Sequence, residues 1–511
     1  MTAPTHPLPT GPTPGPPKPT PASVPAPHPA DPASASVLPA RHAADPAPAS
    51  VPAPHPARST PASVVPAPAS RKGVPGPAEP ARGGASSSPA PAPADQRRPA
   101  VDPARWPDVA APPRASRLRT ALAERIVRRA LARVPLRARL AGAEDIGLGG
   151  PLMDIREPEA FFRRIGASGL IGFGESYMAG EWDAPDLVAV LTVLAGNAAD
   201  LVPAPLQRLR SLWALRKPAA QLNTPEGSRE NISHHYDLSN DLFALFLDGT
   251  LSYSSAVFRS LPATQDLLPA AQHRKIDLLL DAAGVGEGTR LLEIGTGWGE
   301  LALRAAARGA RVVSVTLSAE QRELARTRIR EAGYEDRVEI RLCDYRQVTG
   351  AYDAVVSVEM IEAVGEEFWP VYFTTLDRLL APGGRVALQA ITMPDDRLRA
   401  SRSTYTWIHK YIFPGGLLPS TEAIERVTTG HTRLRTVRRS GYGAHYAETL
   451  RLWRERFTER SAEVDALGFD AVFRRMWTFY LAYSEAGFRS GYLDVQQLLL
   501  TRDQSPAQEA L

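Results

Sequence analysis

The feature that most restricts the fold is an alternation of strand-like and helix-like segments between residues 286 and 392. Short apolar runs such as LLEI, RVVSV and YDAVVSV are separated by longer segments with the apolar spacing of helices. Strands that alternate with helices form βαβ units, whose parallel sheet binds ligands beyond the carboxyl ends of its strands. We therefore predict an α/β fold with a Rossmann-like parallel sheet and a ligand site at that edge.

The first 113 residues differ in composition from the rest of the chain. They contain 33 of its 49 prolines and a single aromatic residue, Trp106, so they cannot bury enough apolar surface to offset the entropy lost on ordering. The segment PASVPAPHPA occurs at residues 21–30 and again at 48–57, and such repeats favour an extended polyproline II spacer. The predicted organisation is a disordered Pro/Ala-rich tail over 1–113, a small mixed α/β domain over 114–215 and a catalytic domain over 216–505.

A concentration of arginine follows the tail. Residues 114–141 hold nine arginines and one acidic residue, Glu124, whereas the whole chain has a formal net charge of only +4, which does not indicate nucleic-acid binding. Leu118, Leu122 and Ile126 recur at four-residue spacing among these arginines, as in a basic amphipathic helix. Such a helix either docks on an anionic membrane surface or packs its apolar stripe against the domain behind it, and the sequence leaves both interpretations open.

Cysteine content and the amino terminus restrict the kinds of site and the compartment. With Cys343 as its only cysteine, the chain forms no internal disulfide and no thiolate zinc cluster. The adjacent His234 and His235 would point about 100° apart on a helix, so we predict no metal site. The amino terminus lacks the basic and apolar regions of a secretion signal, and no apolar run is long enough to span a membrane. We therefore expect a cytoplasmic protein.

A glycine-rich turn connects the first predicted strand to the first helix. Residues 295–299 have the pattern G-x-G-x-G, in which glycine allows a ligand to approach the backbone closely. The dinucleotide fingerprint is G-x-G-x-x-G with an acidic residue near the end of the second strand, where this chain has TLS instead. S-Adenosylmethionine fits better, with Glu293 beside its ammonium group and Asp344, after the third strand, beside its adenine.

Eight sequence blocks occur in order between about residues 230 and 500. Among them are HHYDLSNDLF, LLEIGTGWGELA, EMIEAVG, KYIFPGGLLPS and GAHYAETLRLWRERF. Together they resemble the cyclopropane-fatty-acyl-phospholipid synthases and their relatives, the mycolic acid cyclopropane synthases. Residues 140–200 resemble the small amino-terminal domain of the bacterial phospholipid-acting members, and the tail lies outside the resemblance. The resemblance implies a class I methyltransferase sheet with helical insertions and S-adenosylmethionine as methyl donor.

The resemblance also assigns roles to individual residues. Together with Glu293, the implied cofactor-binding residues are Tyr253, Ser254, Gly295, Gly297, Trp298, Gly299, Thr316, Leu317, Ser318, Gln321, Asp344 and Tyr345. Family members hold a bicarbonate ion that acts as the base. Glu362 and Tyr446 match the residues that bind this ion, and Ile391 matches a backbone contact to it.

Three further candidate catalytic positions depart from the better-known members of the family. Ser255 stands where many members have cysteine, and Gln389 stands where many have histidine. Ser484 occupies a position at which a cysteine was once proposed as nucleophile, so the serine argues against thiol catalysis here. Gln389 can donate a hydrogen bond to an anion but cannot carry a positive charge.

The resemblance implies cyclopropanation of cis-unsaturated acyl chains in membrane phospholipids, with S-adenosylmethionine as methyl donor and bicarbonate as base. The alternative is a methyltransferase of the same family that makes methylene- or methyl-branched fatty acids of the 10-methyl type, which Gln389 and Ser255 favour. A third hypothesis is a non-catalytic scaffold that presents the tail. The implied partners are an unsaturated phospholipid, the inner face of the cell membrane as a peripheral binding surface, and a second copy in a homodimer, with no nucleic acid.

Overall fold

The structure, a computed structural model, describes residues 99–143, 145–198, 239–402 and 404–503. Most of the predicted tail, together with His234 and His235, lies outside the described residues. The sequence assigns residues 99–113 to the tail, but this segment packs against the chain that follows. Val109 of α1 (Pro107–Ala110) is buried, and the Trp106 indole N–H donates to a carboxylate oxygen of Asp470 at 2.8 Å.

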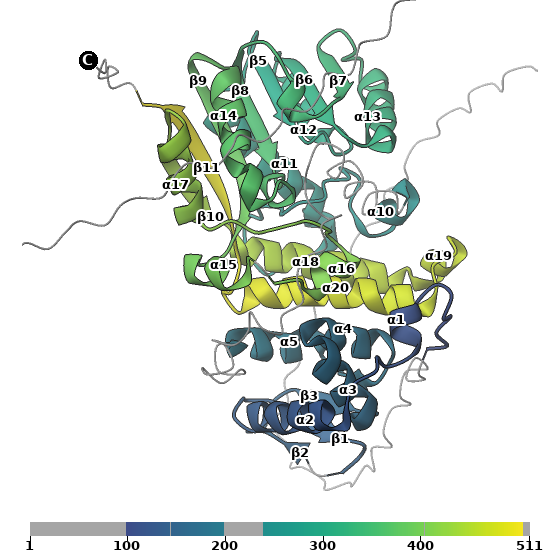
Figure 1. Ribbon diagram of the computed structural model, residues 1–511. Helices are drawn as coiled ribbons and strands as arrows, with labels where there is room; N and C mark the ends of the chain where they lie inside the picture. Colours follow the sequence, from purple (N-terminus) through teal and green to yellow (C-terminus); the bar gives the residue numbers. More distant parts are fainter. Residues whose placement is uncertain (1–98, 144, 199–238, 403, 504–511) are drawn as a thin grey trace, which may run out of the picture. The chain divides into compact units, whose positions relative to one another are not determined.

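Within the described residues, the larger of two sheets has seven strands in the order β10-β11-β9-β8-β5-β6-β7 (Figure 1). They are β5 (Arg290–Ile294), β6 (Arg311–Thr316), β7 (Val338–Leu342), β8 (Tyr352–Val358), β9 (Leu380–Thr392), β10 (Leu434–Gly441) and β11 (Asp494–Arg502). Strands β5 to β9 pair in parallel, whereas β11 runs antiparallel to both of its neighbours, β9 and β10. The predicted Rossmann-like parallel sheet is confirmed, and two antiparallel strands extend it.

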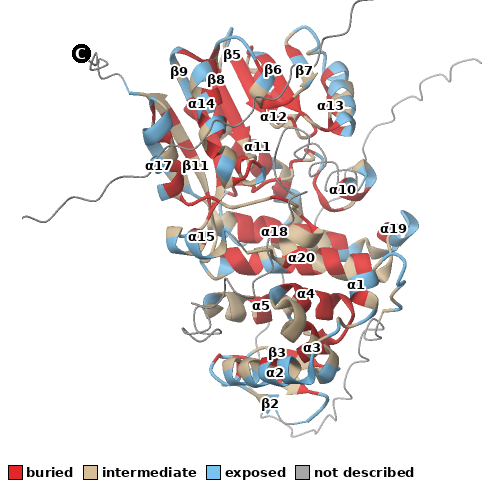
Figure 2. Ribbon diagram, in the orientation of Figure 1, coloured by how far each residue is buried: buried red, intermediate tan, exposed pale blue. Residues whose placement is uncertain are grey.

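Helices cover both faces of this sheet. On one face lie α11 (Leu268–Ala283), α12 (Glu300–Ala307) and α13 (Ala319–Glu331), and on the other α14 (Trp369–Leu379) and α17 (Thr421–His431). Side chains alternate between the faces along a strand, so Leu291 of β5 packs with the first group of helices and Leu292 with the second. Burial on both faces, visible in Figure 2, explains why the parallel strands are almost continuously apolar.

The other helices that follow residue 239 surround the carboxyl ends of the strands of the large sheet or pack beside these strands. They are α10 (Asn240–Phe246), α15 (Asp395–Ser401), α16 (Trp407–Tyr411), α18 (Gly443–Glu459), α19 (Ser461–Ala466) and α20 (Ala471–Arg489), with short 3-10 helices at Gln265–Leu267, Tyr345–Gln347, Ile361–Ala363 and Glu366–Phe368. Helices α18 and α20 pack along each other. Rings from α10, α18 and α20, among them Phe246, Trp453 and Trp477, form one buried aromatic cluster.

The smaller sheet has four short strands in the order β2-β1-β3-β4. Its elements are α2 (Arg117–Leu131), β1 (Arg137–Leu140), β2 (Asp145–Ile146), β3 (Leu152–Ile155), α3 (Pro158–Ser168), α4 (Leu170–Met178), β4 (Trp182–Asp183) and α5 (Leu187–Gly196). Helices α4 and α5 contact α20. Among the described helices, none combines the length and the apolar character that crossing a bilayer requires.

Candidate active site

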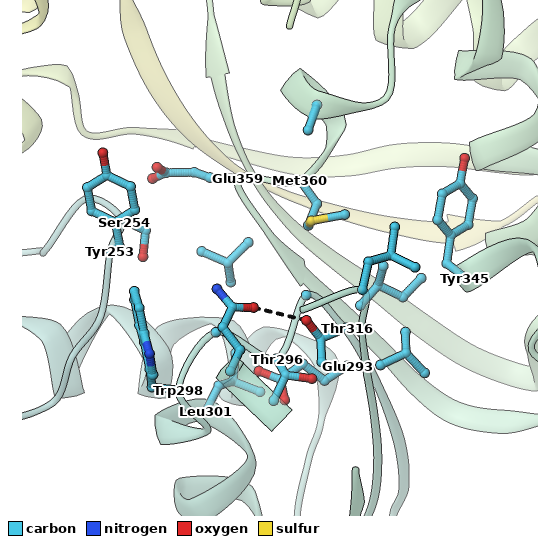
Figure 3. A pocket seen from close by; sticks show the side chains of 18 of the residues that line it. Tyr253, Ser254, Glu293, Thr296, Trp298, Leu301, Thr316, Tyr345, Glu359 and Met360 are labelled. Atoms are coloured by element: carbon cyan, nitrogen blue, oxygen red, sulfur yellow. Dashed lines mark hydrogen bonds between the residues drawn. The ribbon is translucent and has the colours of Figure 1, made fainter. Parts of the chain in front are cut away.

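A pocket lies at the carboxyl ends of β5, β6 and β8, the edge at which the sequence predicts ligand binding. Figure 3 shows Tyr253 and Trp298 on one side of this pocket and Tyr345 on the other. Eleven of the thirteen residues predicted to bind the cofactor line it, namely Tyr253, Ser254, Glu293, Gly295, Gly297, Trp298, Thr316, Leu317, Gln321, Asp344 and Tyr345. The other two, Gly299 and Ser318, have structural roles.

The glycines of the turn are required for two different reasons. Gly295, Gly297 and Gly299 have φ values of 96°, 52° and 90°, which residues with side chains rarely adopt. A Cβ atom on Gly297 would meet nothing within 4 Å, so the backbone there is open to a ligand. A Cβ atom on Gly299 would lie 3.1 Å from the Cβ atom of Ala325. Gly299 therefore allows α12 to approach α13, and it does not line the pocket.

The end of β6 is fixed to the start of α13. The Thr316 hydroxyl donates to Oε1 of Gln321 at 2.9 Å, the dashed line in Figure 3. The Ser318 hydroxyl accepts from the backbone N–H of Gln321 at 3.1 Å and so caps the helix. Ser318 thus positions Gln321, which lines the pocket, and is not itself among the residues that line it.

Asp344 lines the pocket and lies two residues beyond the end of β7. Both of its carboxylate oxygens accept hydrogen bonds from Arg346, Oδ1 from Nε at 2.8 Å and Oδ2 from Nη2 at 2.6 Å. Oδ1 also accepts from the backbone N–H of Arg346 at 2.9 Å, which uses both of its lone pairs, whereas Oδ2 has a second lone pair and can accept again. The arginine therefore fixes the direction of the carboxylate while leaving it able to accept from an amine such as that of adenine.

Glu293 lies near the carboxyl end of β5 and is only 3% exposed. Its Oε2 accepts from the Ser314 hydroxyl at 2.6 Å. Burial raises the pKa of Glu293 to about 8, although the Ser314 hydrogen bond and the charge of Lys275 act in the opposite direction. A carboxyl group with this pKa is mostly protonated at pH 7, and a cationic ligand beside it favours its ionised form. Glu293 therefore suits the ammonium partner that the sequence predicts.

Two buried residues of α11 hold the pocket loop at residues 251–255 in place. The Gln272 side-chain amide donates to the carbonyl oxygen of Ser254 at 2.9 Å. The Lys275 ammonium group donates to the Ser254 hydroxyl at 2.6 Å. Burial lowers the pKa of Lys275 to about 8, although the negative charge of Glu359, and of other carboxylates nearby, raises it. The sequence analysis did not single out either residue.

Three of the predicted catalytic residues donate hydrogen bonds to the carboxyl group of Glu359. Its Oε1 accepts from the backbone N–H of Ser255 at 2.9 Å and from Nε2 of Gln389 at 2.8 Å. Its Oε2 accepts from the Tyr446 hydroxyl at 2.7 Å. Ser255 contributes its backbone, so the serine in place of cysteine does not remove this contact. Glu359 also lines the pocket and was not among the candidate residues.

Glu362 and Ile391 lie beside this group, whereas Ser484 does not join it. Oε1 of Glu362 accepts from the backbone N–H of Ile391. Oε2 of Glu362 is enclosed and has no hydrogen-bond partner among the described residues. Burial and the charge of Glu359 raise the pKa of Glu362 to about 8. Ser484 is a half-buried residue of α20, and no hydrogen bond found among the described residues joins it to Glu359 or Glu362.

The comparison with known families identifies the chain. Residues 224–498 match the family model described as Mycolic acid cyclopropane synthetase. The chain belongs to this family. Tuberculostearic acid methyltransferase UfaA1 of Mycobacterium tuberculosis is 56% identical to it over 417 residues, which cover 80% of this chain and 97% of UfaA1.

Two further members of the synthetase family are similar to the chain. Cyclopropane-fatty-acyl-phospholipid synthase of Escherichia coli is 35% identical over 353 residues, which cover 68% of this chain and 87% of the synthase. Among solved structures, mycolic acid cyclopropane synthase CmaA1 complexed with SAH and CTAB has a chain that is 31% identical in sequence to this one. The structural match covers 56% of this chain and 98% of the CmaA1 chain, with a TM-score of 0.49.

As a member of the synthetase family, the chain is an S-adenosylmethionine-dependent methyltransferase. The pocket described above has features that suit this co-substrate: an open glycine turn and the carboxyl groups of Glu293 and Asp344 in its lining. Within the described ranges, no group of three or more histidine, cysteine or acidic side chains is placed to hold a metal ion.

The residues that the sequence analysis missed carry recognisable signals. Gln272 and Lys275 fall on the same stripe of α11 as Leu268, Ile276 and Leu279, all of which are buried. A polar side chain within such a stripe needs a partner, because burial without one is costly. Glu359 is the first acidic residue after β8, at the carboxyl end of a buried parallel strand, where ligands of such sheets bind.

Proposed function

We propose that this synthetase-family member methylates a cis double bond in a phospholipid acyl chain and forms a methylene-branched product, the precursor of a methyl-branched chain. The observation that carries the proposal is the 56% identity over nearly the whole of UfaA1, a relative named as a tuberculostearic acid methyltransferase. The relative named as a cyclopropane synthase is only 35% identical. This proposal takes the alternative of the sequence analysis in preference to its main expectation of a cyclopropane ring.

The two products differ only after the methyl group has been transferred. The π electrons of the alkene form a bond to the methyl carbon while the sulfonium–carbon bond breaks onto sulfur, which leaves a cation on the neighbouring chain carbon. Loss of a methyl proton at this stage closes a three-membered ring. If a hydride first moves from the methylated carbon to the cationic one, loss of a methyl proton instead gives an exocyclic double bond. Both routes therefore require one base beside the methyl group.

Analysis of the lipid product tests this proposal. The purified protein is incubated with S-adenosylmethionine and vesicles of a phospholipid that carries one cis-monounsaturated chain, and the acyl chains are analysed by mass spectrometry. Both products gain one CH2 group over the substrate. We expect the product to take up one molecule of hydrogen on mild catalytic reduction, because only a branched olefin retains a double bond. A product of that mass that resists reduction would be the ring and would contradict the proposal.

The exposed face of α2 supports a second proposal, docking of the chain on an anionic membrane surface. The Ser116 hydroxyl caps this helix, and its buried residues are Ala123 and Leu131. Leu118 and Leu122, at 79% and 55% exposed, do not pack against the domain behind them. Exposed arginines surround the two leucines on the same helix. Exposed leucines among basic side chains are typical of a helix that lies in a membrane interface.

Vesicle flotation is expected to show binding to anionic vesicles that weakens as salt is raised, because surface charge is screened over about 10 Å at 0.1 M. The double variant Leu118→Gln/Leu122→Gln should float less, since it removes the apolar contact and keeps the charge. Arg438→Gln/Arg439→Gln provides the control, because it removes two exposed arginines from β10 instead. Binding to neutral vesicles that equals binding to anionic ones would contradict the proposed docking.

A further inference from the structure

Four of the candidate catalytic residues offer a donor group to a bicarbonate ion, and carboxylates of this chain use all four of these groups. Glu359 accepts from the Ser255 backbone N–H, the Gln389 amide and the Tyr446 hydroxyl. Glu362 accepts from the backbone N–H of Ile391. A backbone amide and a phenol each have one hydrogen to donate, so three of these donors have none left for a second anion.

The fourth donor, Gln389, is also fully engaged. Its Nε2 donates to Glu359 and, at 3.3 Å, to the carbonyl oxygen of Ser255. Its Oε1 accepts from Nε2 of Gln497 at 3.0 Å, which fixes the orientation of the amide. Of the groups named here, the carboxyl group of Glu362, whose enclosed Oε2 has no hydrogen-bond partner among the described residues, is left to contact a bicarbonate ion. The residues present therefore do not fit a bound bicarbonate.

We propose that the carboxylate of Glu359 is itself the base of this enzyme and stands in the place of the bicarbonate ion. The inference rests on the proposed methylation of an alkene. Glu359 removes a proton from the transferred methyl group, and the electrons of the broken C–H bond form the π bond of the exocyclic double bond, after the hydride shift has placed the cation on the methylated carbon. The proton becomes that of the Glu359 carboxylic acid and passes to water after the products leave.

The backbone at Glu359 supports a role for its side chain. Its φ of 51° lies in the left-handed region, which is uncommon for a residue other than glycine. Unfavourable backbone conformations of this kind tend to persist at functional sites, where the surrounding structure holds them in place. The conformation directs the carboxylate back toward Ser255, on the side of the pocket where Tyr253 and Ser254 also lie (Figure 3).

The surrounding charges favour ionisation of Glu359 over ionisation of Glu362. Burial raises the pKa of Glu359, but three hydrogen-bond donors and the charge of Lys275 oppose this effect. Glu362 has backbone donors only, and it experiences the negative charge of Glu359 in addition to burial. Two neighbouring carboxyl groups avoid ionising together. The hydrogen-bond donors around Glu359 therefore favour the negative charge on Glu359 over Glu362, and Glu359 is the carboxylate available to act as base.

Substitution of Glu359 tests the inference, with release of S-adenosylhomocysteine as the measure of turnover. Glu359→Gln keeps the shape of the side chain and removes the base, and we expect turnover to fall by about 100-fold or more, with S-adenosylmethionine affinity by calorimetry almost unchanged. Glu367→Gln is the matched control, because this exposed glutamate lies on the next 3-10 helix. A loss of less than about tenfold for Glu359→Gln would overturn the proposal.

The dependence of turnover on bicarbonate distinguishes a base that is a side chain of the protein from a base that is a bound ion. In buffer freed of carbon dioxide, the wild-type protein should turn over at its full rate, and added bicarbonate should not raise it. Glu359→Gly relieves the backbone conformation and empties the position of the carboxylate, so bicarbonate should restore part of its lost turnover. Two results would contradict the proposal that Glu359 takes the place of bicarbonate. One is a wild-type protein whose turnover requires bicarbonate, and the other is a Glu359→Gly variant that binds S-adenosylmethionine but is not activated by bicarbonate.

These measurements do not depend on which lipid is formed. Release of S-adenosylhomocysteine reports methyl transfer whether the product is a ring or a branch. A cyclopropane product would therefore refute the proposed function and leave the assignment of Glu359 standing, while an active Glu359→Gln variant would do the reverse.

Discussion

Replacing Arg164 with methionine is expected to lower the free energy of unfolding by about 3 to 5 kcal/mol. The side chain is fully buried in α3, and its Nε donates to both carboxylate oxygens of Glu181, at 2.9 and 3.0 Å. Its Nη atoms donate to the carbonyl oxygens of Asp108 and Val109. Removing the guanidinium takes the neutralising cation away from a buried carboxylate and removes two hydrogen bonds to α1, so the cost is large.

Urea unfolding of the variant and of a neighbouring control checks this prediction. Arg163 pairs with Glu159 at the surface of the same helix, with side chains 37% and 82% exposed. Because exposed ion pairs contribute little, Arg163→Met should change the free energy of unfolding by less than about 1 kcal/mol. The double variant Arg164→Met/Glu181→Met should recover part of the loss, since it removes both buried charges together. Equal effects of Arg163→Met and Arg164→Met would contradict the argument.

The parallel part of the large sheet could be predicted because burial on both faces gives strands such as β5, β6 and β8 a short, mostly apolar run, which the edge strand β7 (VEIRL) lacks. The two antiparallel strands give no such pattern. Strand β10, with the sequence LRTVRRSG, lies at the edge of the sheet, and most of its side chains are at least partly exposed. The sequence of β11 does not identify it as a strand, and its place in the sheet becomes clear only from its pairing with β9 and β10. The strands of the small sheet have two to four residues each, too few for periodicity to show.

Residues of the candidate site could be predicted where their position at the end of a strand places them in the pocket. Residues whose side-chain direction depends on the local backbone conformation could not be predicted in this way. Gly295 and Gly297 of the glycine turn, together with Glu293 and Asp344, follow from strand ends, and all four line the pocket. Two glutamates follow β8, however, and spacing alone does not tell which one faces the co-substrate. The left-handed φ of Glu359 turns its carboxylate toward Ser255. The resemblance selects Glu362, and the geometry adds Glu359.

Replacing Lys275 with methionine is expected to lower turnover at pH 7 by about tenfold and to move the rate profile to higher pH by up to about one unit. Lys275 is buried, and its charge lowers the pKa values of both Glu293 and Glu359. Without that charge, both carboxyl groups hold their protons to higher pH. Since the proposed base acts only when ionised, activity lost at pH 7 should be partly recovered as the pH is raised.

The same substitution is expected to leave the melting temperature at pH 7 unchanged or to raise it, which separates the loss of activity from a loss of folding. Burial lowers the pKa of Lys275 to about 8 from its ordinary value of 10.5, so the folded state binds the lysine proton less tightly than the unfolded chain does. The charged form therefore costs stability below pH 8, by about 3 kcal/mol, and methionine removes that cost while filling the space. Arg274→Met, which removes one exposed charge from the adjacent position, is the control. A Lys275→Met variant with an unchanged rate profile would show that this buried charge does not tune the site.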